Sequence, residues 1–338
     1  MWNEKWKELL NDTLVNGKLV KKKNNGDYLE TLGHKFILEN PRDRLISDNI
    51  HPTNIFQCIG QFLWITQGNF NLEAIKYYQP IAEKFSSDGW KMIGAYGPRL
   101  FGIQHLNQIQ HVFETLHEDS TKRKAVASVY LPQFDQHKKN DEVPCTLNLQ
   151  YLIRDGKLNA ITFMRSQNAY NLLPIDLFIF TMLQEYVTAY LQAEYDLELG
   201  TYYHFSGSFH IYTRSQDEIT RVINNKSTNN NIMEEMPWEN VEVNINKLNQ
   251  FEKVLRTTIV AHERRNVPVD FDFFLGMMDD LPKNEYWRQL ALVLMCYGAY
   301  YIDDNKNLER FNKMLNTIYQ YYVKLFLETY GIKTHKTS

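Results

Sequence analysis

The chain has 338 residues, of which 43% are hydrophobic and 14% aromatic, and its formal net charge is -3. This composition is sufficient for a substantial core and argues against disorder. Since the chain has no overall positive charge, we expect no nucleic acid polymer as a partner, and any phosphate recognition should be local. Three scattered cysteines, Cys58, Cys145 and Cys296, predict free thiols, and their spacing does not indicate a metal site.

The first 20 residues combine apolar positions at helical spacing with charged residues, which predicts an amphipathic helix rather than a signal peptide. No apolar run approaches the roughly 20 residues that cross a bilayer. We therefore expect a cytoplasmic protein that does not associate with membranes.

The next elements follow from the spacing of apolar residues. Residues 34–38 alternate as in a strand, residues 52–67 and 103–117 have helical spacing, and residues 124–131 are β-branched and aromatic as in a strand. Pro52 suits the start of the second of these segments, since proline is tolerated in the first turn of a helix.

A hairpin is the clearest local prediction. Two apolar, partly alternating runs between residues 146 and 163 flank Asp155-Gly156, and glycine adopts positive φ at no steric cost. Pro174 then opens a long apolar helix to about residue 191, and residues 202–213 alternate as a further strand.

The sequence changes character after Arg214. Residues 223–231 are polar and Asn-rich, and helical spacing returns at about 246–263, 285–302 and 306–330. We predict a main domain over residues 1–222, a polar linker over 223–244 and a helical C-terminal region over 245–338. A packed free thiol is the prediction for Cys296, inside the second of these helices.

The run PCTLNLQYLIRDGKLNAITFMRSQN, which begins at Pro144-Cys145 and is followed by LLPID and FHIY, resembles the thymidylate synthase family. The similarity covers about residues 20–214, and the order and spacing of the motifs make it specific. It implies an α/β (α+β) fold with a large mixed sheet and flanking helices, to which the helical C-terminal region is an appendage. It also implies a homodimer with the two sheets back to back.

The resemblance implies a one-carbon transferase. In the family, a cysteine thiolate adds to C6 of a pyrimidine nucleoside monophosphate, and C5 then takes up a one-carbon unit from 5,10-methylene-tetrahydrofolate. Cys145 matches this nucleophile, because a thiolate can add and later leave. A nearby cation should favour the thiolate, and Arg165 matches the family arginine that touches both the cysteine and the phosphate.

Further substrate contacts follow from the same resemblance. Arg165 and Ser166 match the phosphate-binding pair, and arginine's planar fork suits a phosphate dianion. Arg123 and Lys124 match an Arg-Arg pair that crosses the dimer interface to the partner's phosphate.

The sugar and the base have their own matches. His210 and Tyr212 match residues that bind the sugar 3′-hydroxyl, and alternate strand positions share a face. Tyr96 matches a tyrosine near C5 that assists proton removal. Asp176 stands where uracil-specific members carry Asn and cytidylate hydroxymethylases carry Asp. An ionised carboxylate accepts from the cytosine amino group, and the first turn of a helix favours that form. Met164 also resembles the cytidylate branch.

Several positions depart from the family. Gln61 replaces the glutamate that organises proton transfer, whose help is typically worth about 10²–10⁴ in rate. Asn168 replaces an aspartate that helps to seat the folate. A phosphate arginine on an N-terminal loop falls near Asn24 and is missing, and the candidates to replace it are Lys21–Lys23, Arg42, Arg44 and Arg99. The tail that closes over folate in the synthases is not evident.

The sequence leaves three hypotheses open. The leading one is hydroxymethylation of C5 in a cytidine monophosphate, ribo or deoxy, through Cys145. The second is methylation of a uracil nucleotide to give thymidylate. The third is a nucleotide-binding pseudoenzyme whose C-terminal helices bind a protein partner, which Gln61 and Asn168 favour because family resemblance does not guarantee function.

Overall fold

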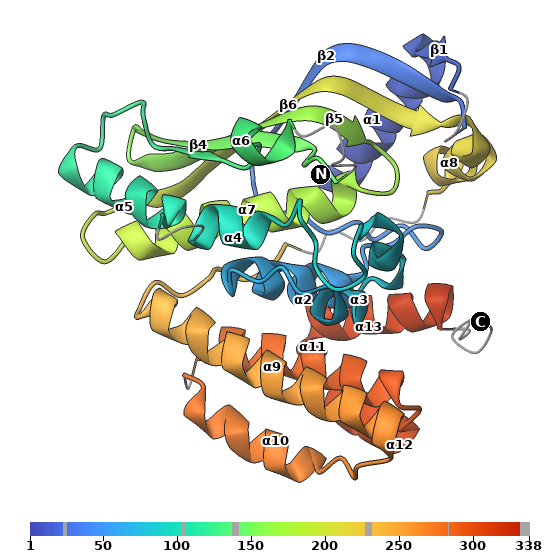
Figure 1. The fold of residues 1–338 in the computed structure, drawn as a ribbon, viewed down its shortest axis with the longest axis vertical. Helices are drawn as coiled ribbons and strands as arrows, with labels where there is room; N and C mark the ends of the chain where they lie inside the picture. The colour runs from blue at the N-terminus through green and yellow to red at the C-terminus, as the bar shows by residue number, and fades with distance from the viewer. Residues whose placement is uncertain (23–25, 103–105, 137–141, 227–231, 283, 332–338) are drawn as a thin grey trace.

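The computed structural model describes residues 1–22, 26–102, 106–136, 142–226, 232–282 and 284–331. It has layers that Figure 1 shows from top to bottom: a twisted sheet, then helix α7 (Leu173–Leu191), then α2 (Ile55–Thr66), then the C-terminal helices. The long helix and the hairpin predicted from the sequence are confirmed. Asn24 and Lys23, two of the positions considered for phosphate binding, lie outside the described residues.

Six strands form one mixed sheet in the order β1-β2-β6-β5-β4-β3. Strands β5 and β6 are parallel and the other neighbours antiparallel, so the sheet is mixed, as expected. Their bounds are β1 Lys18–Val20, β2 Tyr28–Leu38, β3 Val126–Ser128, β4 Thr146–Arg154, β5 Lys157–Asn168 and β6 Glu198–Tyr212. The turn between β4 and β5 has positive φ at Asp155 (52°) and Gly156 (70°), which is the hairpin geometry that Asp-Gly predicts.

A line of irregular pairing crosses the sheet. The ladders pair residues on either side of Gly33, Gly207 and Arg165 but skip these three, and the β4–β5 register shifts at Leu147. Gly33 has φ 62°, and a Cβ at Gly207 would lie 3.0 Å from the carbonyl oxygen of Arg165. The register shift at Leu147 lies beside the part of β5 that carries the predicted phosphate-binding arginine, and a bulge of this kind bends its strand and redirects side chains.

Helices cover one face of the sheet. The first eight are α1 Trp2–Asn16, α2, α3 Leu72–Lys76, α4 Tyr96–Phe101, α5 Gln108–Glu118, α6 Pro132–Asp135, α7 and α8 Gln216–Asn224. Helix α2 begins at Ile55 rather than at Pro52, because the Asn54 side chain caps it by accepting from the backbone N–H of Gln57. Helix α7 is buried on nearly every side, since it lies between the sheet and α2.

The C-terminal helices are α9 Val241–Arg265, α10 Phe271–Met277, α11 Glu285–Tyr301, α12 Asn305–Asn312 and α13 Thr317–Tyr330. The single helix predicted over 306–330 is wrong. Asn316 begins a new helix by accepting from the N–H of Tyr319, so the segment divides into α12 and α13. Cys296 is wholly buried, as predicted, and the three cysteines are free.

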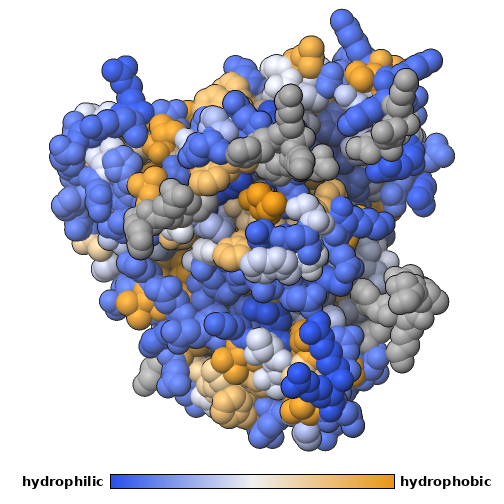
Figure 2. Space-filling view, in the orientation of Figure 1, coloured by the Kyte–Doolittle hydropathy of each residue, from blue (hydrophilic) through white to orange (hydrophobic). Residues whose placement is uncertain are grey.

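The C-terminal helices pack against α2. Helices α9, α11 and α13 all contact it, and the buried apolar residues form one cluster that runs from the sheet into this region. A buried carboxylate joins the two parts: Glu252 on α9 accepts from the Tyr78 hydroxyl at 3.0 Å and pairs with Arg256 at 2.7 Å. On the face that Figure 2 shows, hydrophobic residues are scattered among hydrophilic ones.

Candidate active site

Cys145 is the last residue of a short segment, residues 143–145, that leads into β4. Arg165 donates hydrogen bonds to the carbonyl oxygens of this segment. The Arg165 backbone N–H donates to the carbonyl oxygen of Cys145 at 2.8 Å. Its side chain donates from Nε to Pro144 at 2.9 Å and from a terminal nitrogen to Val143 at 2.7 Å. The guanidinium therefore lies beside the predicted nucleophile.

Glu142 fixes the other end of the segment. Its carboxylate accepts from the backbone N–H groups of Ser87 and Ile93, each at 2.7 Å. A Cβ at Gly94 would lie 2.6 Å from the carbonyl oxygen of Glu142, so the two loops are in close contact. Sequence reasoning missed Glu142, because the loop that it holds is distant in the chain and has no motif.

The pKa of the Cys145 thiol is raised. Burial is the largest cause, the Arg165 cation opposes it, and the Asp176 carboxyl adds to it. The expectation that Arg165 favours the thiolate is therefore correct in sign, but burial outweighs it. The thiol of the free protein is protonated at neutral pH.

Tyr96 begins α4 and reaches the start of β4. Its hydroxyl accepts a hydrogen bond from Thr146 Oγ1 at 3.0 Å, and its ring stacks on Phe180 of α7. Burial and the nearby Asp176 and Cys145 raise the pKa of Tyr96 well above its ordinary value, so the phenol stays neutral. Thr146, directly after the predicted nucleophile, thus connects the tyrosine to the Cys145 segment.

Asp176 lies in the first turn of α7, where Gln167 of β5 donates from Nε2 to its Oδ2 at 2.9 Å. Burial raises the pKa of this carboxyl to about 7, although the Gln167 hydrogen bond lowers it. Burial therefore opposes the ionisation that a first-turn position in a helix favours. Gln167 was not singled out from the sequence.

Gln61 projects from α2 one turn after Cys58, so the two share a face. Cys58 is wholly buried, and the Asp176 carboxyl contributes to its raised pKa, which indicates that this face of α2 lies toward Asp176. The Gln61 Oε1 atom is buried and has no hydrogen-bond partner among the described residues. An unpaired buried acceptor of this kind is costly unless a ligand or water satisfies it.

The β5–β6 ladder brings four predicted residues together. Ser166 pairs with Ser208, Asn168 pairs with His210, and Tyr212 follows two residues later. Burial lowers the pKa of His210, and its Nδ1 has no partner within the described chain. The Asn168 Oδ1 accepts from the backbone N–H groups of Tyr170 and Asn171, so this oxygen shapes the turn into α7.

Arg123 and Lys124 do not join this group within one chain. Both are exposed and precede β3, the edge strand that β4 separates from β5. Gln150 of β4 donates to the Arg123 carbonyl oxygen at 2.8 Å, which fixes the backbone that carries these two exposed cationic residues.

The three arginines proposed as replacements for the missing phosphate arginine are already paired with carboxylates. Arg42 and Arg44 both pair with the buried Glu185, and Arg99 forms two hydrogen bonds to Asp135. Each guanidinium serves a structural ion pair, so Arg42, Arg44 and Arg99 are corrected as candidates. Of the remaining lysines, Lys21 and Lys22 are exposed at the end of β1.

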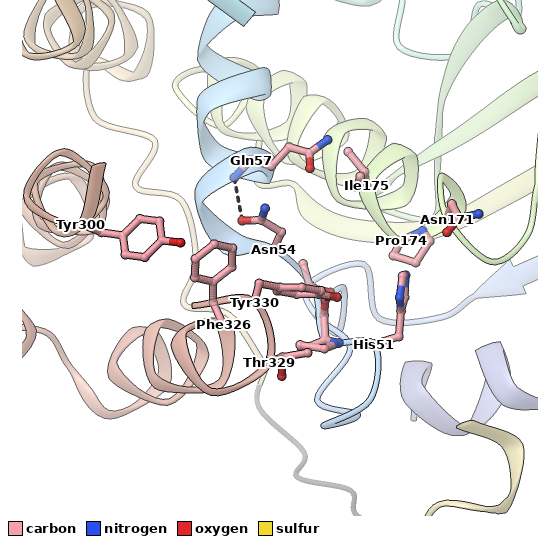
Figure 3. A pocket seen from close by; sticks show the side chains of 12 residues that line it. His51, Asn54, Gln57, Asn171, Pro174, Ile175, Tyr300, Phe326, Thr329 and Tyr330 are labelled. Carbon is pink, nitrogen blue, oxygen red and sulfur yellow. Dashed lines mark hydrogen bonds between the residues drawn. The ribbon is translucent and has the colours of Figure 1, made fainter. Parts of the chain in front are cut away.

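A cavity of about 520 Å³ adjoins the first turn of α7 (Figure 3). Pro174 and Ile175, directly before Asp176, form one wall, and Asn54, the cap of α2, and Gln57 in its first turn form another. The opposite side is closed by Tyr300 of α11 and by Phe326, Thr329 and Tyr330 of α13. The remaining lining residues are His51, Pro52, Thr53 and Asn171. No sequence signal indicated that α13 returns to this position.

Comparison with known families identifies the class. A thymidylate synthase family profile matches residues 4–258, well over half of the chain. The chain therefore belongs to the thymidylate synthase family, and its fold is the one that the resemblance implied. No described helix is long and apolar enough to cross a membrane.

Among individual proteins, the chain is similar to two phage proteins named deoxyuridylate hydroxymethyltransferase. It is 29% identical to that of Delftia phage PhiW-14 over 210 residues, which cover 57% of this chain and 56% of the relative. It is 28% identical to that of Bacillus phage SP01 over 227 residues, covering 60% and 57%. The chain thus spans little more than half the length of these relatives.

Proposed function

We propose that this protein hydroxymethylates C5 of a pyrimidine nucleoside monophosphate, with cytidylate as the leading substrate. The observation that carries the proposal is the grouping of Cys145 with Arg165, Tyr96 and Asp176 at the junction of β4, β5 and α7. Family membership supports the reaction type, and the carboxyl at position 176 supports the cytosine base.

The reaction begins at Cys145. Its thiol loses a proton and Sγ bonds to C6, while the C5–C6 π electrons move to make C5 nucleophilic. Arg165 lowers the thiol pKa and reaches toward the phosphate, and Ser166 adds a donor there. His210 and Tyr212 hold the sugar. Loss of the C5 proton, with release of the folate nitrogen from the transferred carbon, would leave a methylene carbon doubly bonded to C5 while Sγ stays on C6.

The one-carbon donor is 5,10-methylene-tetrahydrofolate, which supplies the methylene carbon when it is bound. The cavity beside Asp176 fits a planar, partly aromatic molecule, since Phe326, Tyr330 and Ile175 offer apolar contact. Asn54, Gln57 and Asn171 line it with amides that can donate and accept. Asn168, at the start of the turn into α7, remains a candidate for the same ligand.

Hydroxymethyl transfer is favoured over methyl transfer. Both phage relatives carry that activity in their names. The amide of Gln61 cannot exchange a proton as a carboxylate does, but its unpaired Oε1 can accept a hydrogen bond from water near Asp176. Addition of that water to the methylene carbon on C5 gives the hydroxymethyl group, and Sγ then leaves C6 as the C5–C6 double bond returns.

We also propose a homodimer with sheets back to back. The face of the sheet opposite α7 presents a half-exposed apolar row: Ile37 pairs with Tyr203, Tyr203 with Ile161, and Phe205 with Phe163. Such a contiguous apolar face suits a second copy of the chain. Arg123 and Lys124, at the edge of this sheet, would then reach the partner's phosphate.

A uracil nucleotide is the second candidate substrate. The names of the relatives favour it, and the raised pKa of Asp176 is compatible with it, because a neutral carboxyl donates one hydrogen bond as well as accepting. Release of tritium from C5-labelled CMP, dCMP, UMP and dUMP tests the proposal. We expect Cys145-dependent release from a cytosine nucleotide, and no release from any of the four would contradict it and favour a nucleotide-binding pseudoenzyme.

A further inference from the structure

Gln167 is buried beneath the site, and its amide has one possible orientation. It is 1% exposed, and Nε2 donates to Asp176 Oδ2 at 2.9 Å and to the carbonyl oxygen of Asn168 at 3.4 Å. A backbone carbonyl only accepts, so the NH₂ end of the amide must lie here. A flipped amide would place Oε1 against two oxygens.

The other end of this amide does not stabilise the fold. Gln167 Oε1 is buried without a hydrogen-bond partner among the residues that the structure describes, which is unfavourable. An apolar side chain of similar length would fill the same space without an unpaired acceptor. The contribution of Gln167 therefore lies in its Nε2, whose shorter hydrogen bond is the one to Asp176.

The hydrogen bond from Gln167 makes the two carboxyl oxygens of Asp176 different. Oδ2 accepts from Nε2, so the proton of a neutral carboxyl resides on Oδ1. The carboxyl then presents one fixed donor and one fixed acceptor, like an oriented amide. An ionised carboxyl has no donor and loses this asymmetry.

We propose that Gln167 is a positioning residue that fixes the proton of Asp176 on Oδ1 and so determines which pyrimidine base the site accepts. The inference rests on the proposed function, in which Asp176 reads the base. Cytosine offers an acceptor at N3 and a donor at N4, whereas uracil offers a donor at N3 and an acceptor at O4. A fixed donor–acceptor pair complements only one of these two orders.

The other ionisable groups around Asp176 do not obscure its titration. Cys145 precedes β4, Tyr96 begins α4, Cys58 lies on α2 and Tyr202 on β6, and burial raises the pKa of each. Arg165 on β5 is the nearby cation that lowers the thiol pKa. A change in base preference near neutral pH therefore reports on Asp176.

Gln167→Met tests the inference, and Gln184→Met is its matched control. Gln184 is also fully buried between α7 and the sheet, donates from Nε2 to carbonyl oxygens, and has an unpaired Oε1. The ratio of kcat/KM for dCMP and dUMP, and the ratio of their Kd values by calorimetry, are measured at about pH 6 and about pH 8, on either side of the Asp176 pKa.

We expect Gln167→Met to reduce the base discrimination at about pH 6 by roughly tenfold or more, while Gln184→Met leaves it unchanged. Asp176→Asn should prefer the same base as the wild type at about pH 6, because Gln167 orients the new amide with its NH₂ in place of Oδ1. The inference is overturned if Gln167→Met discriminates between dCMP and dUMP as the wild type does. The Kd ratio decides this where the protein binds nucleotides without turnover. Failure of the wild type to bind either nucleotide overturns the proposed function as well.

Discussion

Arg165 and Cys145 are joined backbone to backbone: the Arg165 N–H donates to the Cys145 carbonyl oxygen at 2.8 Å. The Arg165 side chain extends the same contact to the two residues before the cysteine. The contact lies on the line of irregular pairing through Gly207 and Leu147. These contacts place a cation beside a half-buried thiol, and among the described residues Arg165 forms no salt bridge that competes for it.

Replacing Arg165 by Met should slow alkylation of Cys145. Removal of the cation leaves burial unopposed, so the thiol pKa rises and the thiolate fraction at about pH 8 falls, by roughly tenfold for each pKa unit. The measurement is the rate of iodoacetamide labelling at Cys145, followed by mass spectrometry. Cys58 and Cys296 serve as internal controls, because burial raises the pKa of both and they should stay unlabelled. An unchanged rate at Cys145 would show that Arg165 does not act on the thiol.

Asp176→Asn should stabilise the protein most at alkaline pH. The folded pKa of about 7 lies above the ordinary 3.8, so the native carboxyl binds a proton more tightly than the unfolded one. Stability from this group is present below about pH 4 and is lost as pH rises toward and through 7. We expect a gain in Tm of several degrees at about pH 8 and a much smaller one at about pH 5. A gain that is equal at both values would mean that Asp176 titrates normally.

Phe326→Leu should weaken binding of tetrahydrofolate several-fold while nucleotide binding persists. The substitution keeps an apolar side chain in α13 but removes the aromatic face from the cavity. The Kd of tetrahydrofolate in the presence of saturating nucleotide provides the measurement. Phe311→Leu is the control, since Phe311 is buried in α12 and does not line the cavity. Equal effects of the two substitutions would argue against donor binding at this cavity.

Phe205→Asp should convert the proposed dimer to a monomer and weaken nucleotide binding. Phe205 stacks on Phe163 with ring centroids 5.2 Å apart on the uncovered face of the sheet, and a buried unpaired charge there would be strongly unfavourable. Sedimentation velocity gives the oligomeric state. Val254→Asp, at an exposed apolar position on α9, is the control and should leave it unchanged. A Phe205→Asp protein that sediments like the wild type would rule out this face as the interface.

Local sequence patterns were sufficient to predict those helices and turns that are determined by neighbouring residues in the chain. Asp155-Gly156 predicted its hairpin because glycine and aspartate tolerate positive φ, and the apolar content of α7 predicted a long buried helix. The break at Asn316 was not predicted, since helical spacing continues across it and only the cap marks the boundary.

The ionisation of the site could not be predicted from sequence. The pKa values of Asp176 and Cys145 depend on how completely α2 and β5 exclude water, which residue types alone do not indicate. Likewise, the sequence could not exclude Arg42, Arg44 and Arg99 as phosphate-binding candidates, because their carboxylate partners are distant in the chain. The cavity wall from α13 depends on packing between segments more than a hundred residues apart.

The central claim is hydroxymethylation of C5 in a cytosine nucleotide through Cys145, and mass spectrometry of reaction products tests it most directly. CMP, dCMP, UMP and dUMP are each incubated with the protein and 5,10-methylene-tetrahydrofolate, with Cys145→Ala as the control. The account predicts a hydroxymethylated cytosine nucleotide from the wild type and none from the variant. A methylated uracil nucleotide, an equal yield from Cys145→Ala, or no product from any of the four would contradict it.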